Sequence, residues 1–530
     1  MRWLFYAISI IGSLSIFVIY QFWPPISYLL YIFIPYILIG LRDIFSTRHT
    51  VLRNYPVIGH LRYMLESIRP EIQQYFVESD SSGTPYSREI RSLVYQKAKG
   101  VTETIAFGTK NDITSIGYVF SYHSLSPKHV APSSTRVIIG GKDCKKPYNA
   151  SRMNVSGMSF GAISPNAIRA LNKGAKIGNF CQSTGEGGVS PYHLEHGGDL
   201  VWQIGTGYFG CRHKDGTFNQ DAFAEVVGRN DVIKMIEIKL SQGAKPAHGG
   251  ILPAAKVNEE IAKIRMLEPH KDAISPPGHS AFSNPIEFMH FIAKLRQISG
   301  ARPIGFKLCI GHKAEFMSIC KAMIETGIKP DFITIDGAEG GTGAAPVTFT
   351  NRIGTPINEA LTFVHNCLIG ANLRDDIKLI ASGKIATGYD MVMKIALGAD
   401  SCNVARAMMF ALGCLQSLSC NTDRCPTGIA TQNRHRWSAL DVKDKSVRVA
   451  NFQKRTVESF CELVGAMGLD DPEKLEPMHI RRYIDSSTSK SFAQIYHSLS
   501  PGELLDRKST GHFIDLWNIA TTKSFIPEFL

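Results

Sequence analysis

Three cysteines near the carboxyl end are the residues with the clearest potential for chemistry. Cys414, Cys420 and Cys425 follow one another at intervals of six and five positions (414 to 420 to 425), and Pro426 comes directly after the last. This spacing is too compact for a pair of zinc knuckles, and the set is one short of the usual four cysteines. Three thiolates in one loop, followed by proline, are typical of iron–sulfur ligands. The alternative is three inert thiols, because free cysteine often serves as a small apolar core residue.

Glycines and bases that follow the last predicted strands form a candidate phosphate site. Backbone N–H groups of glycine loops bind phosphate at the late strands of barrels. Lys384 and Arg406 would each add a positive charge. The loops concerned are Gly340–Gly343, Ser382–Lys384 and Ala405–Arg406. Taken singly, the same residues are ordinary turns with solvated bases.

One lysine lies inside a predicted strand. Lys307 stands between apolar neighbours in residues 304–309, and a buried lysine needs an anionic partner. A flavin fits this requirement, because its reduced ring carries negative charge near N1. The alternative is a lysine that points outward from the strand end.

Three further charged residues are candidates for substrate chemistry. Lys245 and Arg265 bracket a predicted helix, and two cations that face one pocket suit a dicarboxylate. Arg265 is otherwise a solvated helix residue. Glu186 lies among glycines that bring the backbone close to another group, where it would relay protons or cap a turn.

These residues need a scaffold, and strands alternate with helices from residue 153 on. Such alternation predicts a parallel sheet, and about eight units predict a closed (β/α)₈ barrel of the TIM type. In a barrel the candidate loops gather at the carboxyl face, where chemistry occurs. The predicted strands span 153–157, 232–240, 304–309, 332–336, 377–381 and 401–404, and the helices 165–176, 256–266, 313–326, 356–368, 389–396 and 406–415.

Two apolar stretches at the amino terminus predict a transmembrane hairpin. Residues 3–20 and 26–41 each approach the length of a membrane-spanning helix, and Pro24 and Pro25 break the run between them. The alternatives are a signal peptide or a single anchor. Because basic residues favour the cytosolic side, the catalytic domain is expected in the cytosol, with membrane lipid as a partner. The basic residues are Arg42, Arg48, Arg53, Arg62 and Arg69.

Composition narrows the remaining possibilities. The chain of 530 residues has a formal charge of +12, but no nucleic-acid motif accompanies it, so no nucleic-acid partner is expected. Scattered cysteines argue against a disulfide-rich secreted protein. Helices are predicted at 59–76 and 87–98, and a long amphipathic helix ends at Gly468. The predicted divisions are a hairpin (1–45), a linking segment (46–135), the barrel (136–435) and a helical extension (436–530).

Several glycine-, proline- and cysteine-containing motifs follow one another along residues 158–432. Together they resemble the FMN-binding synthase domain of the glutamate synthase family, over roughly residues 135–435. The motifs are Met158–Gly161, Thr184–Gly188, Gln242–Pro246, Leu252–Val257, Ile274–Pro277, Gly340–Ala344 and Cys425–Gln432.

The resemblance implies a reaction and two cofactors. In that family, 2-iminoglutarate formed from 2-oxoglutarate and ammonia is reduced to L-glutamate. Electrons from ferredoxin or another donor would pass through a [3Fe–4S] cluster on Cys414, Cys420 and Cys425 to FMN. Lys245 and Arg265 would hold the substrate, with Lys245 and Glu186 as catalytic residues. The positions expected to contact FMN are Met158, Ser159, Gln242, Lys307, Gly341, Gly343, Ser382, Gly383, Lys384, Ala405 and Arg406.

The chain also departs from that family. It begins Met1-Arg2 rather than with the glutaminase cysteine, so ammonia is expected free or from a separate glutaminase subunit. Ile251 and His248 stand where the family has a glutamine and an acidic residue. Loss of polar ligands shifts substrate preference, so a different amine or oxoacid is an alternative, as in an N-alkylglutamate-type synthase. A further alternative is a non-catalytic, membrane-tethered electron-transfer subunit.

Overall fold

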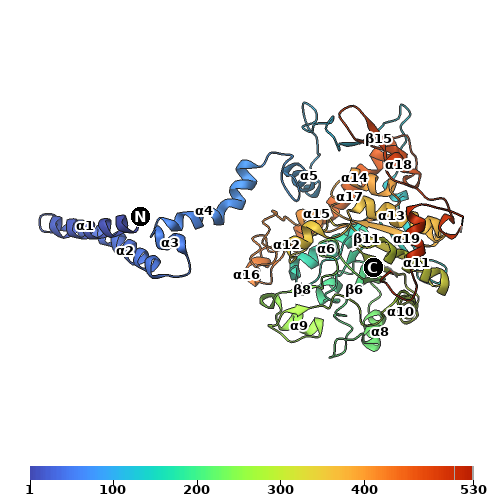
Figure 1. Ribbon diagram of the computed structural model, residues 1–530, viewed down its shortest axis with the longest axis horizontal. Coiled ribbons are helices and arrows are strands. Elements are labelled where there is room, and N and C mark those ends of the chain that lie inside the picture. Colours follow the sequence, from blue (N-terminus) through green and yellow to red (C-terminus); the bar gives the residue numbers. More distant parts are fainter. Residues whose placement is uncertain (507, 528–530) are drawn as a thin grey trace. The chain divides into compact units, whose positions relative to one another are not determined.

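A closed barrel of eight parallel strands forms the centre of the fold (Figure 1). The computed structural model describes residues 1–506 and 508–527. Around the barrel the strands follow the order β10-β11-β12-β13-β4-β5-β6-β7, which confirms the predicted (β/α)₈ fold. Their bounds are β4 Met153–Val155, β5 Gln182–Ser183, β6 Leu200–Ile204, β7 Ile233–Lys239, β10 Ile304–Leu308, β11 Phe332–Asp336, β12 Lys378–Ser382 and β13 Ser401–Val404.

Helices connect and cover these strands. Six of the eight strands lie where alternation predicted them, whereas β5 and β6 were missed. Strand β5 has only two residues and lies in a glycine-rich segment, while β6 has five residues and was overlooked. The helix predicted at 406–415 ends early because Gly413 takes a positive φ of 104°. The helices are α6 Pro165–Gly178, α7 Pro191–Leu194, α8 Gln220–Arg229, α10 Pro285–Ile298, α11 Lys313–Thr326, α13 Ile357–Gly370, η5 Arg374–Asp376, α14 Gly388–Ala396 and α15 Arg406–Ala411.

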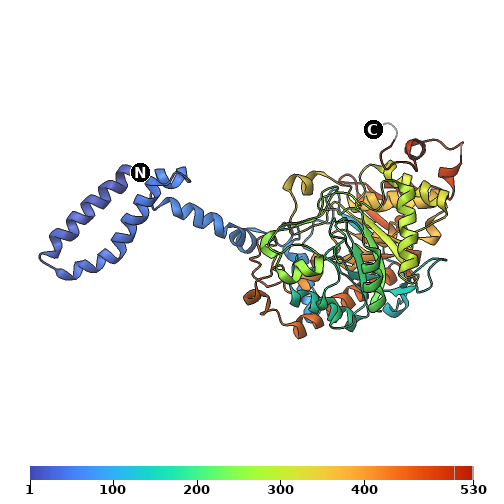
Figure 2. The same ribbon diagram turned by 90° about the horizontal axis from the view of Figure 1, so that it is seen from below.

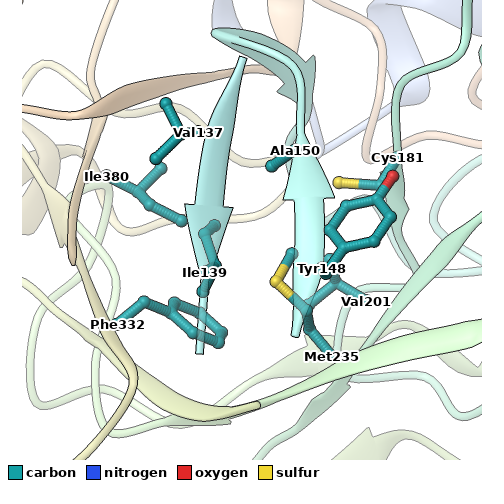
Figure 3. Close-up of a cluster of buried hydrophobic side chains, with 9 residues drawn as sticks. All are labelled: Val137, Ile139, Tyr148, Ala150, Cys181, Val201, Met235, Phe332 and Ile380. Atoms are coloured by element: carbon teal, nitrogen blue, oxygen red, sulfur yellow. The ribbon is translucent and has the colours of Figure 1, made fainter. Parts of the chain in front are cut away.

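A short antiparallel hairpin closes the amino-terminal end of the barrel (Figure 3). Strands β2 (Val137–Ile139) and β3 (Tyr148–Ala150) turn alternate side chains into a buried apolar cluster. The other members come from the barrel strands and from Cys181, which directly precedes β5, and are Cys181, Val201, Met235, Phe332 and Ile380. Because this end is filled with apolar side chains, polar chemistry is left to the carboxyl end.

Two excursions from the strand ends cover that carboxyl end. The first leaves β7 and contains β8 (Ile251–Leu252), η4 (Ala254–Lys256), α9 (Glu259–Arg265) and β9 (Ala273–Ile274). The helix predicted at 256–266 is therefore part of this excursion, and α10 connects β7 to β10 instead. The second excursion follows β11 and contains α12 (Val347–Arg352).

The carboxyl-terminal segment packs on the outside of the barrel. The long helix α17 (Val442–Ala466) lies on α6 and buries Val449, Phe452 and Phe460 along one stripe. Strand β1 (Val119–Ser121) pairs with β14 (Ile480–Tyr483). The remaining elements are α5 Arg88–Lys99, η3 Pro132–Ser134, α16 Arg434–Trp437, η6 Pro472–Lys474, η7 Pro477–His479, β15 Ser489–Ser491, α18 Phe492–Ile495, η8 Glu503–Leu505 and α19 His512–Ile519.

A separate compact unit comprises Met1–Arg88, and the barrel unit begins at Glu89. In the first unit, α1 and α2 form an antiparallel pair (Figure 2) in which Phe5 packs on Gly40 and Phe33 on Gly12. Both spans are long and apolar enough to cross a membrane, and only 6% of each is buried, unlike a soluble core helix. The elements are α1 Arg2–Tyr20, η1 Pro24–Leu29, α2 Leu30–Phe45, α3 Thr50–Asn54, α4 Gly59–Ile72 and η2 Gln73–Val77.

The close approach of α6 and α17 gives a test of the packing. A Cβ on Gly174 would lie 2.6 Å from Val449 Cγ1 and 2.9 Å from the carbonyl oxygen of Ser446. We expect Gly174→Ala to lower the free energy of unfolding by about 1–3 kcal/mol, because overpacking forces the two helices apart. Urea unfolding followed by circular dichroism measures this loss.

The matched control is Gly228→Ala on α8. A Cβ there meets nothing within 4 Å, so alanine should be neutral or stabilise by up to about 1 kcal/mol through helix propensity. Equal stability of the two variants would contradict the packing.

Candidate functional site

A largely buried ion pair lies at the carboxyl end of the barrel. Lys239, the last residue of β7, places Nζ 2.8 Å from Glu186 Oε1 and 3.2 Å from Gln242 Oε1. Burial raises the pKa of Glu186, but the Lys239 ammonium, followed by Arg265 and Lys245, outweighs burial and lowers it below the ordinary value. Glu186 is therefore a carboxylate at neutral pH.

A second buried pair joins neighbouring strands. Lys307 Nζ lies 3.3 Å from Asp336 Oδ2, and Asp336 also accepts from Ser382 Oγ at 2.8 Å and from the N–H of Gly243 at 2.9 Å. Burial lowers the pKa of Lys307, but the carboxylates of Asp336 and Glu237 outweigh it and raise that pKa. The outward-pointing alternative for Lys307 is wrong. Since Asp336 supplies the anionic partner, burial of Lys307 does not by itself require a flavin.

Lys245 and Arg265 are both buried near Glu186. They are 2% and 4% exposed, so the solvated alternative for Arg265 is wrong. Arg265 Nη2 donates to the carbonyl of Phe160 at 3.0 Å, and the guanidinium lies 5.1 Å from the centre of the Phe209 ring. Burial lowers the pKa of Arg265 to about 10 and also lowers that of Lys245, while Glu186 opposes both shifts. The two cations are thus electrostatically coupled to one carboxylate.

The glycines around Glu186 bring its loop against the loop that follows β4. A Cβ on Gly185 would lie 2.6 Å from the backbone nitrogen of Ser159, and one on Gly187 would lie 3.1 Å from Arg265 Nη2. Met158 is buried in the same loop. The glycines beside Glu186 therefore bring its backbone close to Met158–Ser159 and to Arg265.

The predicted phosphate loops meet at one corner of the carboxyl end. Arg406 lies against Gly341, where a Cβ would be 2.9 Å from Nη1, and Nη2 donates to the carbonyl of Glu339. Gly383 packs on Ile357, the first residue of α13, whose N–H donates to Glu339 Oε2 at 2.9 Å. A Cβ on Gly343 would lie 3.6 Å from Cys420 instead. Lys384 is exposed, Ala405 caps α15, and Ser382 is engaged by Asp336.

The three cysteines lie in the loop that follows α15, as partly buried free thiols. The N–H of Gln416 donates to Cys414 Sγ at 3.4 Å, and Cys425 Sγ lies 3.4 Å from Thr427 Oγ1. Burial raises the pKa of Cys414 to about 12, whereas hydrogen bonds from Thr427 and backbone N–H groups outweigh burial at Cys425 and lower its pKa. In residues 1–506 and 508–527, no three His, Cys, Asp or Glu side chains converge to hold a single metal ion.

Lys256 fastens this cysteine loop to the excursion from β7. Its ammonium donates to the carbonyls of Cys420 at 2.8 Å, Ala430 at 2.9 Å and Ala162 at 3.3 Å. An ammonium has three N–H donors, so each finds an acceptor. The contacts join the excursion, the cysteine loop and the loop after β4.

A small cavity lies beside the Glu186–Lys239 pair. His248 contributes to its wall and contacts the ring of Phe349, with 5.3 Å between ring centres. Ile251 is not part of the wall, lies on β8 and is 38% exposed. The lining residues are Glu186, Thr206, Lys239, Leu240, Ser241, Gln242, Ala247, His248, Gly249, Gly250 and Pro277.

Sequence reasoning missed Lys239, Asp336 and the role of Lys256. Lys239 stands between Ile238 and Leu240, so the argument that singled out Lys307 would have found it. Asp336 ends a predicted strand but carries no local signal of its partner. The acceptors of Lys256 come from distant segments, and no local pattern indicates them.

Comparison with known proteins shows the family of the chain. The family model described as a conserved region in glutamate synthase matches residues 121–470. The chain belongs to the glutamate synthase family. Glutamate synthases are oxidoreductases acting on CH–NH₂ groups, so the predicted enzyme class is confirmed.

Relatives in this family cover different shares of the chain. The glutamate synthase large subunit-like protein YerD of Bacillus subtilis is 38% identical over 83% of this chain and 91% of its own length. The archaeal glutamate synthase [NADPH] of Methanocaldococcus jannaschii is 34% identical over 61% of this chain and 60% of its own.

Solved structures show more distant likenesses. A mandelate oxidase with (S)-4-hydroxymandelic acid has a TM-score of 0.44 at 13% identity, covering 74% of this chain and 99% of its own. That likeness is too slight to bear on function.

A partly buried histidine beside the carbonyl of Lys239 gives a pH test. His279 Nε2 lies 2.9 Å from the carbonyl of Lys239 and Nδ1 lies 3.0 Å from the Tyr208 hydroxyl, and burial lowers its pKa to about 4. Between about pH 6.5 and 4 the unfolded chain binds a proton that the folded chain excludes. The free energy of unfolding should therefore fall as pH falls through this window, by up to about 1.4 kcal/mol per pH unit from this group.

Urea unfolding at several pH values measures that slope. His279→Gln should flatten it, and His270→Gln, at an exposed position, should not. Identical slopes in all three proteins would show that folding does not lower the pKa of His279.

The contacts of Lys256 predict local destabilisation. Lys256→Met leaves three carbonyls without their donor, at a cost of about 1–3 kcal/mol for each that stays buried. Amide exchange in residues 413–433 should therefore accelerate by about tenfold or more, since tenfold corresponds to about 1.4 kcal/mol of local opening. Hydrogen–deuterium exchange with mass spectrometry measures it. Lys263→Met, exposed on α9, is the control, and equal exchange in both would refute the fastening role.

Proposed function

We propose that this chain is a flavin- and iron–sulfur-dependent oxidoreductase that reduces 2-iminoglutarate to L-glutamate with electrons from an external donor. The observation that carries the proposal is the convergence of buried Lys245 and Arg265 on Glu186 at the carboxyl end of a barrel of this family. 2-Oxoglutarate and ammonia, free or from a separate glutaminase subunit, would form the imine.

The buried cations suit a dicarboxylate substrate. Arg265 Nε has no hydrogen-bond partner among the described residues. A carboxylate that binds the guanidinium would supply one, and the Lys245 ammonium would hold the second carboxylate. Both contacts orient the substrate beside the Glu186–Lys239 pair.

The same end of the barrel fits FMN. When bound, FMN supplies the conversion between one-electron supply and two-electron reduction. Gly341, Gly383 and Arg406 gather at one corner, where glycine backbone and a guanidinium suit a phosphate. Lys307 lies deeper, where a cation suits the ring. The residues proposed to hold FMN are Met158, Ser159, Gln242, Lys307, Gly341, Gly343, Ser382, Gly383, Lys384, Ala405 and Arg406.

The cysteine loop fits a [3Fe–4S] cluster by its donor set. Such a cluster would bind each of the three cysteine thiolates to a different iron. The three cysteine sulfurs therefore need not converge on a single metal ion. Cys414, Cys420 and Cys425 supply three free thiols, and a backbone N–H group already donates to Cys414 Sγ. Hydrogen bonds of this kind tune such clusters.

Glu186 is placed to handle a proton. Its Oε1 accepts from Lys239 Nζ at 2.8 Å beside the small cavity. A proton exchanged at Oε1 would reach the nitrogen of a substrate held by Lys245 and Arg265. Because Glu186 is ionised at rest, its role begins as an acceptor or as part of a relay.

One observation favours a second candidate for the amine. His248 contributes to the cavity wall, in place of the family's acidic residue. An imidazole in place of a carboxylate changes the preferred amine, so an N-alkylglutamate-type synthase is the alternative. Comparison of ammonium with methylamine as co-substrate separates the two activities.

The amino-terminal unit and the net positive charge of the chain bear on the location of the enzyme and on its electron donor. We assign α1 and α2 to a membrane hairpin with the barrel on the cytosolic side, because basic residues follow the second span. An acidic ferredoxin is the proposed donor for a chain of formal charge +12.

Substitution of Lys245 and Arg265 tests the proposed substrate site. Lys245→Ala and Arg265→Ala should each raise KM for 2-oxoglutarate by about 10- to 100-fold, because each removes a charged hydrogen bond worth about 1.5–3 kcal/mol. Anaerobically purified protein, assayed with ammonium and reduced ferredoxin, gives the measurement, and Lys263→Ala is the control. A colourless wild-type protein without flavin or iron would end the cofactor assignment. Unchanged cellular function in both variants would favour a non-catalytic electron-transfer subunit.

A further inference from the structure

Helix α4 carries an apolar stripe that its own compact unit leaves exposed. Leu61, Met64, Leu65, Ile68 and Ile72 recur at helical spacing, so they share one face. These side chains are 38–52% exposed. The opposite face carries Glu66, Ser67 and Gln73. A soluble helix of this pattern would bury its stripe against a core.

The position of α4 is fixed relative to the hairpin. Asp43, 3% exposed near the end of α2, accepts from the N–H of Val57 at 2.9 Å and lies 2.9 Å from His60 Nε2. Arg2 at the start of α1 donates to Asn54 of α3 at 2.9 Å. The start of α1, the end of α2 and the start of α4 therefore gather at one end of the hairpin, and Figure 2 shows α4 leaving it at an angle to α2.

Charge around the stripe fits an anionic lipid surface. Arg62 and Arg69, seven positions apart, lie beside Leu65 at one edge of the stripe, and Glu71, seven positions after Met64, lies at the other edge. Residues 42–72 contain five arginines against three acidic residues, Asp43, Glu66 and Glu71, a net charge of +2. Basic residues that border an apolar face are typical of helices that lie in the membrane interface.

We propose that α4 lies in the plane of the membrane surface, with its stripe in the acyl boundary of an anionic leaflet. This rests on the proposal that the hairpin crosses the membrane, because α4 begins where both spans end. A spanning hairpin places that end at the lipid–water boundary, and the stripe then meets lipid as soon as the helix begins. The segment after the hairpin is in this case a membrane-bound element and not a free tether.

Depth-dependent quenching tests this with the full chain in vesicles of phosphatidylcholine and phosphatidylglycerol. A fluorescent amino acid is placed at Leu65 on the stripe, at Glu66 on the polar face, or at Ile10 in α1. With lipids brominated near the headgroup, emission at position 65 should fall several-fold more than at position 66. Arg62→Gln with Arg69→Gln should reduce the loss at position 65, and so should vesicles of phosphatidylcholine alone.

The position in α1 separates the two proposals. Deeply brominated lipids should quench position 10 if the hairpin crosses the membrane. Quenching at position 10 without quenching at 65 overturns the proposal for α4 and leaves the anchor intact. Absence of quenching at both positions overturns both. A stripe covered by a second copy of the chain or by the barrel unit would leave 65 no more quenched than 66, which also overturns the proposal.

Discussion

Burial of positive charge is the constraint on which the carboxyl end of the barrel depends. Lys239, Lys245, Arg265 and Lys307 are all buried there, and burial of a cation is costly unless the cation is paired or hydrogen-bonded. The carboxylates facing them are Glu186, Asp336 and Glu237. Four cations thus face three carboxylates, which leaves an excess of one positive charge. An excess of this sign favours binding of an anion over binding of a cation.

The rest of the fold serves to keep that end polar and enclosed. The β2–β3 hairpin fills the interior of the opposite end with apolar side chains, and the charged residues of the candidate site lie at the carboxyl end. Glycines allow the covering loops to approach closely, as Gly185 does against Ser159 and Gly249 against the carbonyl of Ser275. The excursion from β7 brings Arg265 from a helix outside the barrel to the same carboxylate that β7 pairs through Lys239.

The sequence predicted the barrel well and its buried pairs poorly. The strands β10 and β11 each have five residues with three large apolar side chains, which is a local signal, whereas β5 has two residues and gives almost none. Glycine loops and Arg265 were identified because their residue types are distinctive. The pairing of Lys307 with Asp336 spans 29 positions (307 to 336) and depends on strand neighbours, which no local pattern specifies. The excursion helix α9 was placed correctly in sequence but assigned the wrong position in the fold.

The three carbonyls held by Lys256 make distant loops thermodynamically dependent on one another. Since one ammonium satisfies Ala162, Cys420 and Ala430 together, release of any one loop weakens the hold on the other two. Substitutions in the loop after β4 and in the cysteine loop should then show non-additive free energies in double-mutant cycles.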